Sequence, residues 1–288
     1  MWSGGKRSDG NYPLLSAAIA QGLYHPRCKD SHSTWFPELH KDATPYTKEE
    51  IAELEGAERA EQRQQYAQRQ AEKYRRMEKY SLDGDNQRKY GNLAGQWEQE
   101  TVNRKMQEVM DTCNEMEYPY GVTLGYQAQN VKTAIVTDPD TTFAYNAKTD
   151  TLELNPANPK FADFDFTETV LHELAHRYDV LSAHSWESAE FAAALTESKK
   201  YVINNLDAVG ELVEETRKNG FVQDILEILS DSKLDVYAGH GVLTEMAQKM
   251  EVFANLSSLR ARKDPGYDLL TQHFPQLTKV FEHLFEGA

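Results

Sequence analysis

Cysteine and long apolar runs are both scarce in this 288-residue sequence. The chain has only 2 cysteines, Cys28 and Cys113, which are too few for a disulfide scaffold and favour a reducing compartment. No stretch reaches the roughly 18 to 20 apolar residues that a membrane span needs, and polar residues and a glycine interrupt the longest candidate, residues 14–23. The first residues lead into no secretory signal peptide. We therefore expect a cytoplasmic protein that crosses no membrane.

Basic residues are also few relative to acidic ones. The chain has 31 Lys and Arg against 46 Asp and Glu, a formal net charge of -15. Because proteins that grip phosphate backbones need a basic surface, this balance argues against nucleic acid as a partner. The charge changes along the chain, since residues 1–46, 47–116 and 117–288 carry net charges of +1, -3 and -13. We expect three regions with these bounds and different roles.

The first region, residues 1–46, is rich in glycine and proline, which predicts a loop-rich segment. A short helix is expected over about residues 12–23, where apolar residues recur at helical spacing. His25, Cys28 and His32 follow it at spacings that suit metal ligation, although no fourth ligand lies nearby. The alternative is a tight turn that buries Cys28 as a small apolar residue.

The second region has the composition of a charged helical arm. Thr47 and Glu50 form a capping box, and no strong helix breaker follows until about Lys79. A turn is predicted at residues 81–85 and a second helix over about residues 86–116, so we expect an antiparallel helical hairpin. The apolar stripe of its first helix is narrow. Such an arm is either a solvated connection or a surface that packs along a partner.

The third region begins with short β-prone runs separated by turn residues. These runs occupy residues 122–124, 131–136, 142–145 and 151–154, and residues 146–150 form a hairpin loop between the last two. We expect a small sheet of three or four strands ahead of a series of helices. The predicted fold class is therefore α+β and mostly α: a helical arm, a small β-sheet and a C-terminal helical subdomain.

The strongest chemical signal is a His-Glu-x-x-His run inside a predicted helix, for which Asp165 and Glu168 form a capping-box start. His172 and His176 are four residues apart, so both imidazoles leave one face of the helix about one turn apart. Their nitrogens are then able to hold one Zn²⁺. Glu173 lies beside the open position of such a metal, where it is able to take a proton from a bound water. The alternative is a solvated helix face without a metal.

A zinc site of this kind needs a third protein ligand, and several carboxylates are candidates. Glu251 is followed by apolar residues on its predicted helix, so it faces the interior, where a carboxylate requires a nearby cation. We therefore favour Glu251, although its side chain could also reach solvent at the edge of the helix. The other candidates are Glu187 and Glu197 and, ahead of these two, Glu190 and Asp235.

Three further residues carry weaker signals. His240 and Tyr237 lie in a glycine-flanked segment between predicted helices, where either is able to donate a hydrogen bond to the oxyanion of a tetrahedral intermediate. We assign this catalytic role to His240. Asp179, about one turn after His176, is either an acceptor that orients a ligand imidazole or an ordinary surface acid.

The first and second regions together resemble a known family. Residues 22–32 (GLYHPRCKDSH), followed by WFP at residues 35–37, resemble a signature of tailed-phage minor head proteins. These are the Mu gpF-like head morphogenesis proteins and especially phage minor capsid protein 2. The resemblance covers roughly residues 5–116. It implies association with phage portal or capsid proteins and a location in the virion or the bacterial host cytoplasm.

The third region resembles the zincin metallopeptidases. The resemblance rests on the His-Glu-x-x-His helix after a small sheet, and on residues 251–255 (EVFAN), which are similar to a helix of zincin-like domains fused to phage and toxin proteins. It implies Zn²⁺ as cofactor, held by His172, His176 and Glu251 in the gluzincin manner, and a protein or peptide substrate. A metzincin would need histidine at the position of Ser182, so that subclass is disfavoured.

Together these signals favour a zinc-dependent metallopeptidase-like domain attached to a phage minor head protein segment. Peptide bonds would be hydrolysed by metal-activated water, with Glu173 as the general base. The alternative is a structural protein of the phage head or portal whose zincin fold is catalytically silent.

Overall fold

The computed structural model of the protein describes residue 19, residues 47–231 and residues 243–287. By its internal contacts the chain divides into two compact units, Met1–Glu58 and Arg59–Ala288. The second unit holds nearly all of the described structure, and of the described helices and strands only the start of the first long helix, residues 48–58, belongs to the first unit.

Several expectations lie outside the described residues. They include the helix near residues 12–23, of which only residue 19 is described, and the phage-like segment at residues 22–37. The remaining ones concern individual side chains, namely the metal-binding hypothesis for His25, Cys28 and His32 and the roles assigned to Asp235, Tyr237 and His240.

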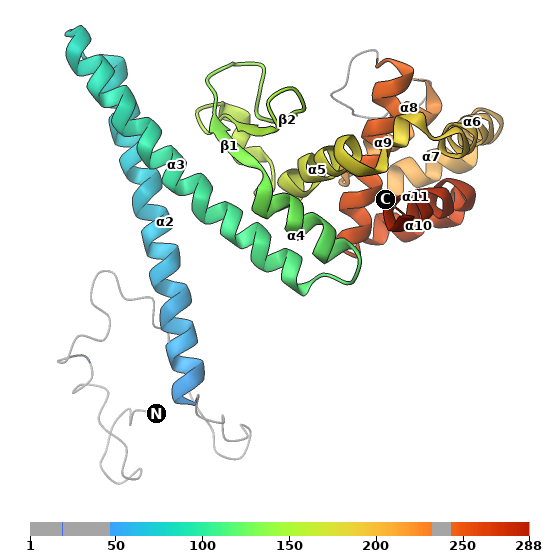
Figure 1. Cartoon of the computed structure of the whole chain (residues 1–288), viewed down its shortest axis with the longest axis horizontal. Helices are drawn as coiled ribbons and strands as arrows, with labels where there is room; N and C mark the ends of the chain where they lie inside the picture. Colours follow the sequence, from blue (N-terminus) through green and yellow to red (C-terminus); the bar gives the residue numbers. More distant parts are fainter. Residues whose placement is uncertain (1–18, 20–46, 232–242, 288) are drawn as a thin grey trace. The chain divides into compact units, whose positions relative to one another are not determined.

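Two long helices, α2 (Lys48–Tyr80) and α3 (Gly84–Glu115), form the predicted antiparallel hairpin (Figure 1). The turn between them is closed by Asp83, whose carboxylate accepts hydrogen bonds from the first backbone N–H groups of α3. Across the hairpin, the Arg75 guanidinium binds the Glu98 carboxylate through two nitrogens, at 2.7 and 2.6 Å. The hairpin is therefore held by a bidentate ion pair as well as by its narrow apolar stripe.

The second half of α3 belongs to the hydrophobic core. Val102, Met106, Val109 and Cys113 recur at spacings of four, three and four residues, and all four are buried. This stripe packs against α4 (Tyr120–Asn130) and against the helix that carries His172. The second half of α3 thus lines the hydrophobic core, while its first half pairs with α2.

The strand predicted at residues 122–124 is wrong, because these residues lie within α4. The buried residues of α4 include Tyr120, Leu124 and Ala128, each four residues after the last, so the helical period is satisfied by packing on α3. The β-branched residues on which the prediction rested are a weak signal that tertiary packing overrides. Gly121 permits the close approach, since a Cβ there would lie 2.4 Å from a backbone oxygen of α3.

Three strands, β1 (Lys132–Ile135), β2 (Phe143–Asn146) and β3 (Thr151–Leu154), form one sheet in the order β1-β3-β2. β3 is parallel to β1 and antiparallel to β2. Leu152 and Leu154 on the central strand are fully buried and alternate with half-buried residues. The predicted strands after α4 and the hairpin between the last two are confirmed. The edge strand β2 lies against the His-Glu-x-x-His helix.

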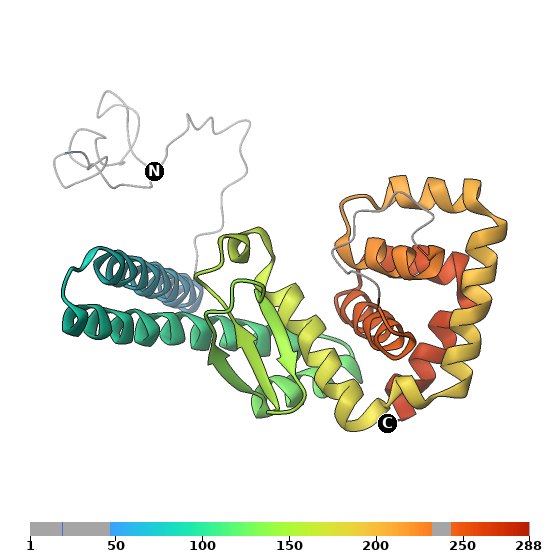
Figure 2. The ribbon, with the colours of Figure 1, turned by 90° about the horizontal axis from the view of Figure 1, so that it is seen from above.

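The rest of the unit is helical (Figure 2). Its longer helices pack around α9, whose residues from Val252 to Leu259 are all buried, as expected for a helix at the centre of a bundle. Short helical turns at Pro159–Asp163, Asp179–Ala183 and Ser185–Glu187 join these elements. In chain order the helices are α5 (Phe166–Tyr178), α6 (Ala189–Asn204), α7 (Leu206–Glu215), α8 (Gly220–Ser230), α9 (Glu245–Ala261), α10 (Pro265–His273) and α11 (Pro275–Gly287).

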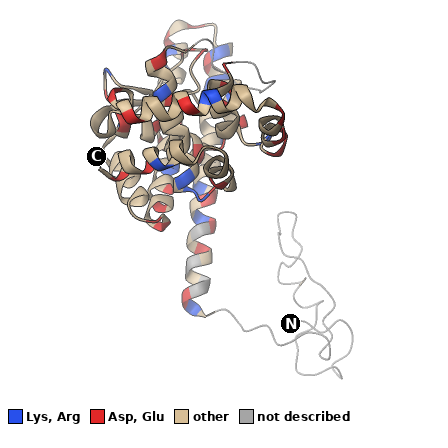
Figure 3. Ribbon diagram, turned by 90° about the vertical axis from the view of Figure 1, so that its right-hand side faces the viewer, with Lys and Arg blue, Asp and Glu red and all other residues tan. Residues whose placement is uncertain are grey.

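The fold class is thus α+β and mostly α, with one small sheet among many helices. Within the described ranges, no helix combines the length and the apolar character that crossing a membrane requires. Acidic and basic residues are interspersed along the helices (Figure 3).

Candidate metal centre

The helix α5 forms where the sequence predicts it and presents its two histidines on one face. The Asp165 carboxylate accepts a hydrogen bond from the Glu168 backbone N–H at 2.9 Å and so caps the first turn. The apolar residues Val170, Leu171, Leu174 and Ala175 are fully buried and anchor the helix in the core. His172 and His176 therefore project together from the remaining face.

The helix α9 supplies the carboxylate. It packs antiparallel to α5, since Ser258 near its end donates to the backbone oxygen of Glu168 at the start of α5 (3.4 Å). Glu251 lies seven residues, or about two turns, before Ser258, and this offset places it opposite the two histidines. Residues separated by 75 positions in the sequence thus meet because two helices pack side by side.

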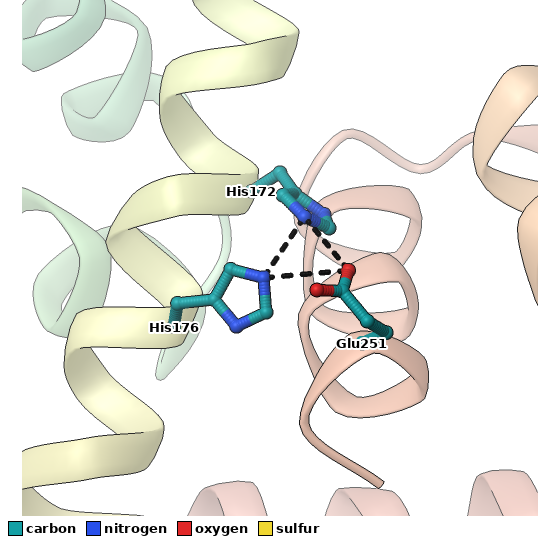
Figure 4. A group of neighbouring side chains, drawn as sticks. All are labelled: His172, His176 and Glu251. Atoms are coloured by element: carbon teal, nitrogen blue, oxygen red, sulfur yellow. Dashed lines mark hydrogen bonds and ion pairs between the residues drawn. The ribbon is translucent and has the colours of Figure 1, made fainter. Parts of the chain in front are cut away.

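Three donor atoms converge between these helices (Figure 4). The Nε2 atoms of His172 and His176 are 3.0 Å apart, and Oε2 of Glu251 lies 3.4 Å from the first and 3.5 Å from the second. This group of three could hold a metal ion. The alternative carboxylates Glu187, Glu190 and Glu197 are exposed at or near α6 and are not members of the group.

The spacing and chemistry of the donors fit zinc. In a tetrahedral site with bonds of about 2.0 to 2.1 Å, the ligand atoms stand about 3.3 Å apart, close to the separations found here. Two imidazoles and one carboxylate are also a donor set that zinc accepts while keeping a fourth position open. The imidazole rings stand nearly perpendicular, at 89°, and so are not stacked on each other.

Burial and charge act on this group in opposite directions. Burial opposes protonation of His176, but the Glu251 carboxylate outweighs it and raises the pKa of the imidazole, with smaller contributions from Glu173 and Asp179. Burial would raise the pKa of Glu251, yet hydrogen bonds from both imidazoles hold it well below its usual range. The carboxylate is therefore ionised, and the group favours a positive charge at its centre, which a proton or a metal cation supplies.

Glu173 is held toward the sheet. Its Oε2 accepts a hydrogen bond from the backbone N–H of Tyr145 on β2, at 2.7 Å. Within residues 47–231 and 243–287, Oε1 of Glu173 has no hydrogen-bond partner, so it is available to a water molecule. The sequence did not reveal Tyr145 as part of the site, because a backbone donor has no residue-type signature.

Asp179 matches neither of the two roles that the sequence suggests, an acceptor for a ligand imidazole or a surface acid. Its two carboxylate oxygens accept hydrogen bonds from the backbone N–H and the hydroxyl of Ser185, both at 2.7 Å. Asp179 is fully buried, and this burial raises its pKa to about 6. Its hydrogen bonds therefore fasten the turn after α5 instead of orienting an imidazole.

Two buried side chains, His172 and Asn255, have polar atoms that are chemically complementary. Nδ1 of His172 and both amide atoms of Asn255 are buried without a hydrogen-bond partner among the described residues. Asn255 lies one turn after Glu251 on α9, and the antiparallel packing places it opposite the His172 turn of α5. An imidazole that binds a metal through Nε2 carries its proton on Nδ1 and requires an acceptor there, a role open to the Asn255 oxygen.

Phe221, at the start of α8, covers the other side of His172. The two rings are stacked at 5.4 Å between centroids with only 7° between their planes. The aromatic ring limits the rotation of the imidazole and shields it from solvent. Phe221 has no distinctive signature in the sequence, since a single aromatic residue at a helix start is indistinguishable from a core residue.

Comparisons of the chain with protein-family models, with curated proteins and with solved structures gave no match. Function is therefore inferred from the residues and their geometry.

Proposed function

We propose that this protein is a zinc-dependent metallopeptidase of the His-Glu-x-x-His type. The observation that carries the proposal is the convergence of His172, His176 and Glu251, with Glu173 next to the first ligand on the same helix. His172, His176 and Glu251 would hold the ion. When bound, zinc would supply a Lewis acid that lowers the pKa of a water toward about 7 and polarises a carbonyl.

Glu173 supplies the proton transfers. Its Oε1 accepts a proton from the attacking water, while Oε2 remains on the Tyr145 N–H, so the carboxylate keeps its orientation during the transfer. The same carboxyl then returns the proton to the leaving amine as the peptide bond breaks. Phe221 and the apolar packing of α5 exclude bulk water from one side of the ligand histidines.

Metal content and hydrolysis together test the proposal. Purified protein should contain one zinc per chain and cleave members of a broad peptide library. His176→Ala and Glu251→Ala should lose both properties, while Glu173→Gln should keep the zinc and lose about 100- to 10,000-fold in rate. His283→Ala and Glu190→Ala, which alter exposed residues of the same types, serve as matched controls. Wild-type protein without zinc, or a fully active Glu173→Gln variant, would refute the proposal.

The phage association is a second part of the proposal and rests on the sequence resemblance, which is most specific at residues 22–37. Their resemblance to phage minor capsid protein 2 supports attachment of the peptidase-like unit to a phage head. Co-sedimentation of the full chain with phage heads or with a portal protein tests it. If the chain never sediments with heads, the phage association is refuted. The proposal of a zinc-dependent peptidase is not affected by that result.

A further inference from the structure

The hydrogen bond that holds Glu173 depends on a single N–H at the edge of the sheet. Tyr145 lies opposite Leu152 in the register of β2 and β3, but its backbone N–H points away from β3 and donates to Glu173 at 2.7 Å. An outward-facing N–H of an edge strand has no partner in the sheet itself. The Glu173 carboxylate is therefore the acceptor on which protection of this N–H depends.

The side chain of the same tyrosine is fixed from the hairpin. The Tyr145 hydroxyl donates to Oδ1 of Asp150 at 3.0 Å. Asp150 lies directly before β3 with a left-handed backbone (φ 49°), a conformation that aspartate tolerates better than most residues. Its carboxylate accepts two hydrogen bonds from Arg177, from Nε at 2.7 Å and from Nη2 at 2.9 Å. The guanidinium holds the pKa of this carboxyl below its usual range.

Arg177, which binds Asp150, lies on the same helix as Glu173, α5. It lies four residues after Glu173, one turn along the same helix, and its side chain is only 7% exposed. Its remaining nitrogen donates to the side-chain oxygen of Gln127 on α4. The contacts form a closed ring that leaves α5 at Glu173, passes through Tyr145 and Asp150, and rejoins α5 at Arg177.

We propose that Tyr145, Asp150 and Arg177 form a clamp that positions the Glu173 carboxylate. The clamp holds β2 where the Tyr145 N–H meets Oε2 of Glu173, and so leaves Oε1 free to accept a proton. Its three members are positioning residues, because none belongs to the metal group and they act on the reaction only through Glu173. This inference rests on the proposed function for its purpose, but its geometry is testable without any hydrolysis.

Amide-resolved hydrogen exchange of the zinc-loaded full chain tests the clamp directly. The Tyr145 N–H should be protected in the wild type and in Glu173→Gln, whose amide oxygen still accepts, and it should lose protection in Glu173→Ala. Arg177→Lys keeps the charge but loses the two-pronged contact, and Tyr145→Phe removes only the hydroxyl. Both should speed exchange of this one N–H by about three- to tenfold. Zinc content should stay at one per chain in every variant.

A kinetic measurement separates positioning from a general loss of structure. Arg177→Lys and Tyr145→Phe should lower kcat by about tenfold with little change in KM, as expected for a displaced general base. The matched control is Glu168→Gln, which removes an ion pair with Arg262 at the other end of α5 and should change neither kcat nor the Tyr145 exchange rate.

Three outcomes are decisive. Rapid exchange of the Tyr145 N–H in the wild type, or wild-type exchange in both Arg177→Lys and Tyr145→Phe, would overturn the clamp. If Glu168→Gln speeds exchange of the Tyr145 N–H as much as Arg177→Lys does, the clamp is also overturned. Any loosening of α5 would then be enough to expose this N–H. If the exchange pattern is as expected but zinc-loaded wild type cleaves no peptide, the clamp stands and the peptidase proposal fails.

Discussion

The helical hairpin and the α5–α9 pair each bury a glutamate between two helices, but they give it different partners. Glu98 in the hairpin, 5% exposed, is bound by both prongs of the Arg75 guanidinium. Glu251 on α9, 18% exposed, faces two imidazoles at 3.4 and 3.5 Å. A guanidinium carries a permanent charge, so Glu98 is fully compensated within the fold. An imidazole carries a charge only when it takes up a proton, and Glu251 favours that protonation of His176, so the group favours an added cation, either a proton or a metal.

Asp179 is a third buried acid and completes the comparison. Its partners are the neutral N–H and O–H donors of Ser185, and its burial raises its pKa to about 6. The three acids show that burial alone does not mark a functional carboxylate. The charge of the partner decides whether the acid is structural, titrating or ready to bind a metal.

The largest expected effect comes from adding zinc. Zinc at about 1,000 times its Kd should stabilise the fold by about 4 kcal/mol. In the zinc-free protein the raised pKa of His176 gives a stabilisation that is complete below pH 6.5 and is lost as pH rises through the raised value. Protons compete with zinc for the imidazoles, so the gain in Tm on adding zinc should increase from about pH 5 to about pH 8.

Calorimetry with and without zinc at several pH values measures this gain. Glu251→Gln should reduce it at every pH, because the negative ligand is lost. An equal zinc-induced gain at pH 5 and pH 8, or an undiminished gain in Glu251→Gln, would contradict the comparison with the hairpin.

Breaking the hairpin pair should have the next largest effect and should leave zinc binding unchanged. Arg75→Met leaves Glu98 buried without its counter-charge and should cost about 2 to 3 kcal/mol, at the low end because Arg75 is 30% exposed. Urea unfolding measures the loss. The double variant Arg75→Met/Glu98→Leu is the matched control and should recover most of it, since no charge remains buried. A double variant as unstable as the single one would show that the charge pair is not the cause.

Asp179→Asn should change how stability depends on pH. The folded pKa of about 6 lies above the ordinary aspartate pKa of 3.8, so the wild type takes up a proton on folding between these values and loses stability as pH rises from about 4 to about 6. Asp179→Asn lacks this loss. Its free energy of unfolding relative to that of the wild type should therefore rise by about 2 kcal/mol over that pH interval. Parallel pH profiles from urea unfolding would contradict this. Asp207→Asn, at an exposed position, is the control.

Asn255→Leu should have the smallest effect. It should act in opposite directions on the stability of the zinc-free fold and on the affinity for zinc. Removing a buried amide that has no partner within the described ranges should leave the zinc-free fold as stable or slightly more stable. If the Asn255 oxygen accepts from His172 Nδ1 when zinc is bound, its loss should weaken zinc binding by about tenfold. A competition titration with a zinc chelator measures the affinity, and Asn255→Asp should retain it. Unchanged affinity in Asn255→Leu would exclude Asn255 from the zinc site.

Local signals in the sequence were enough for the elements that depend on neighbouring residues. The Asp165 cap and the apolar run after it placed α5, and the four-residue separation of His172 and His176 placed both imidazoles on one face. The β2–β3 hairpin followed from alternating residues around a turn. Residues 122–124 were misassigned because their β propensity is weak and the deciding contacts are with α3, which a local pattern does not contain.

By itself the sequence determined the two histidines, their neighbour Glu173 and the helix that carries them, because helical periodicity relates residues four apart without any other part of the chain. It also favoured Glu251 by its apolar surroundings. Only the tertiary structure decided that α9 packs antiparallel to α5 and brings Glu251 to the histidines, and that a strand N–H and the Arg177 ring of contacts hold Glu173. The physical reason is that packing angles, offsets between helices and backbone donors depend on the whole core, whereas periodicity is a property of a single segment.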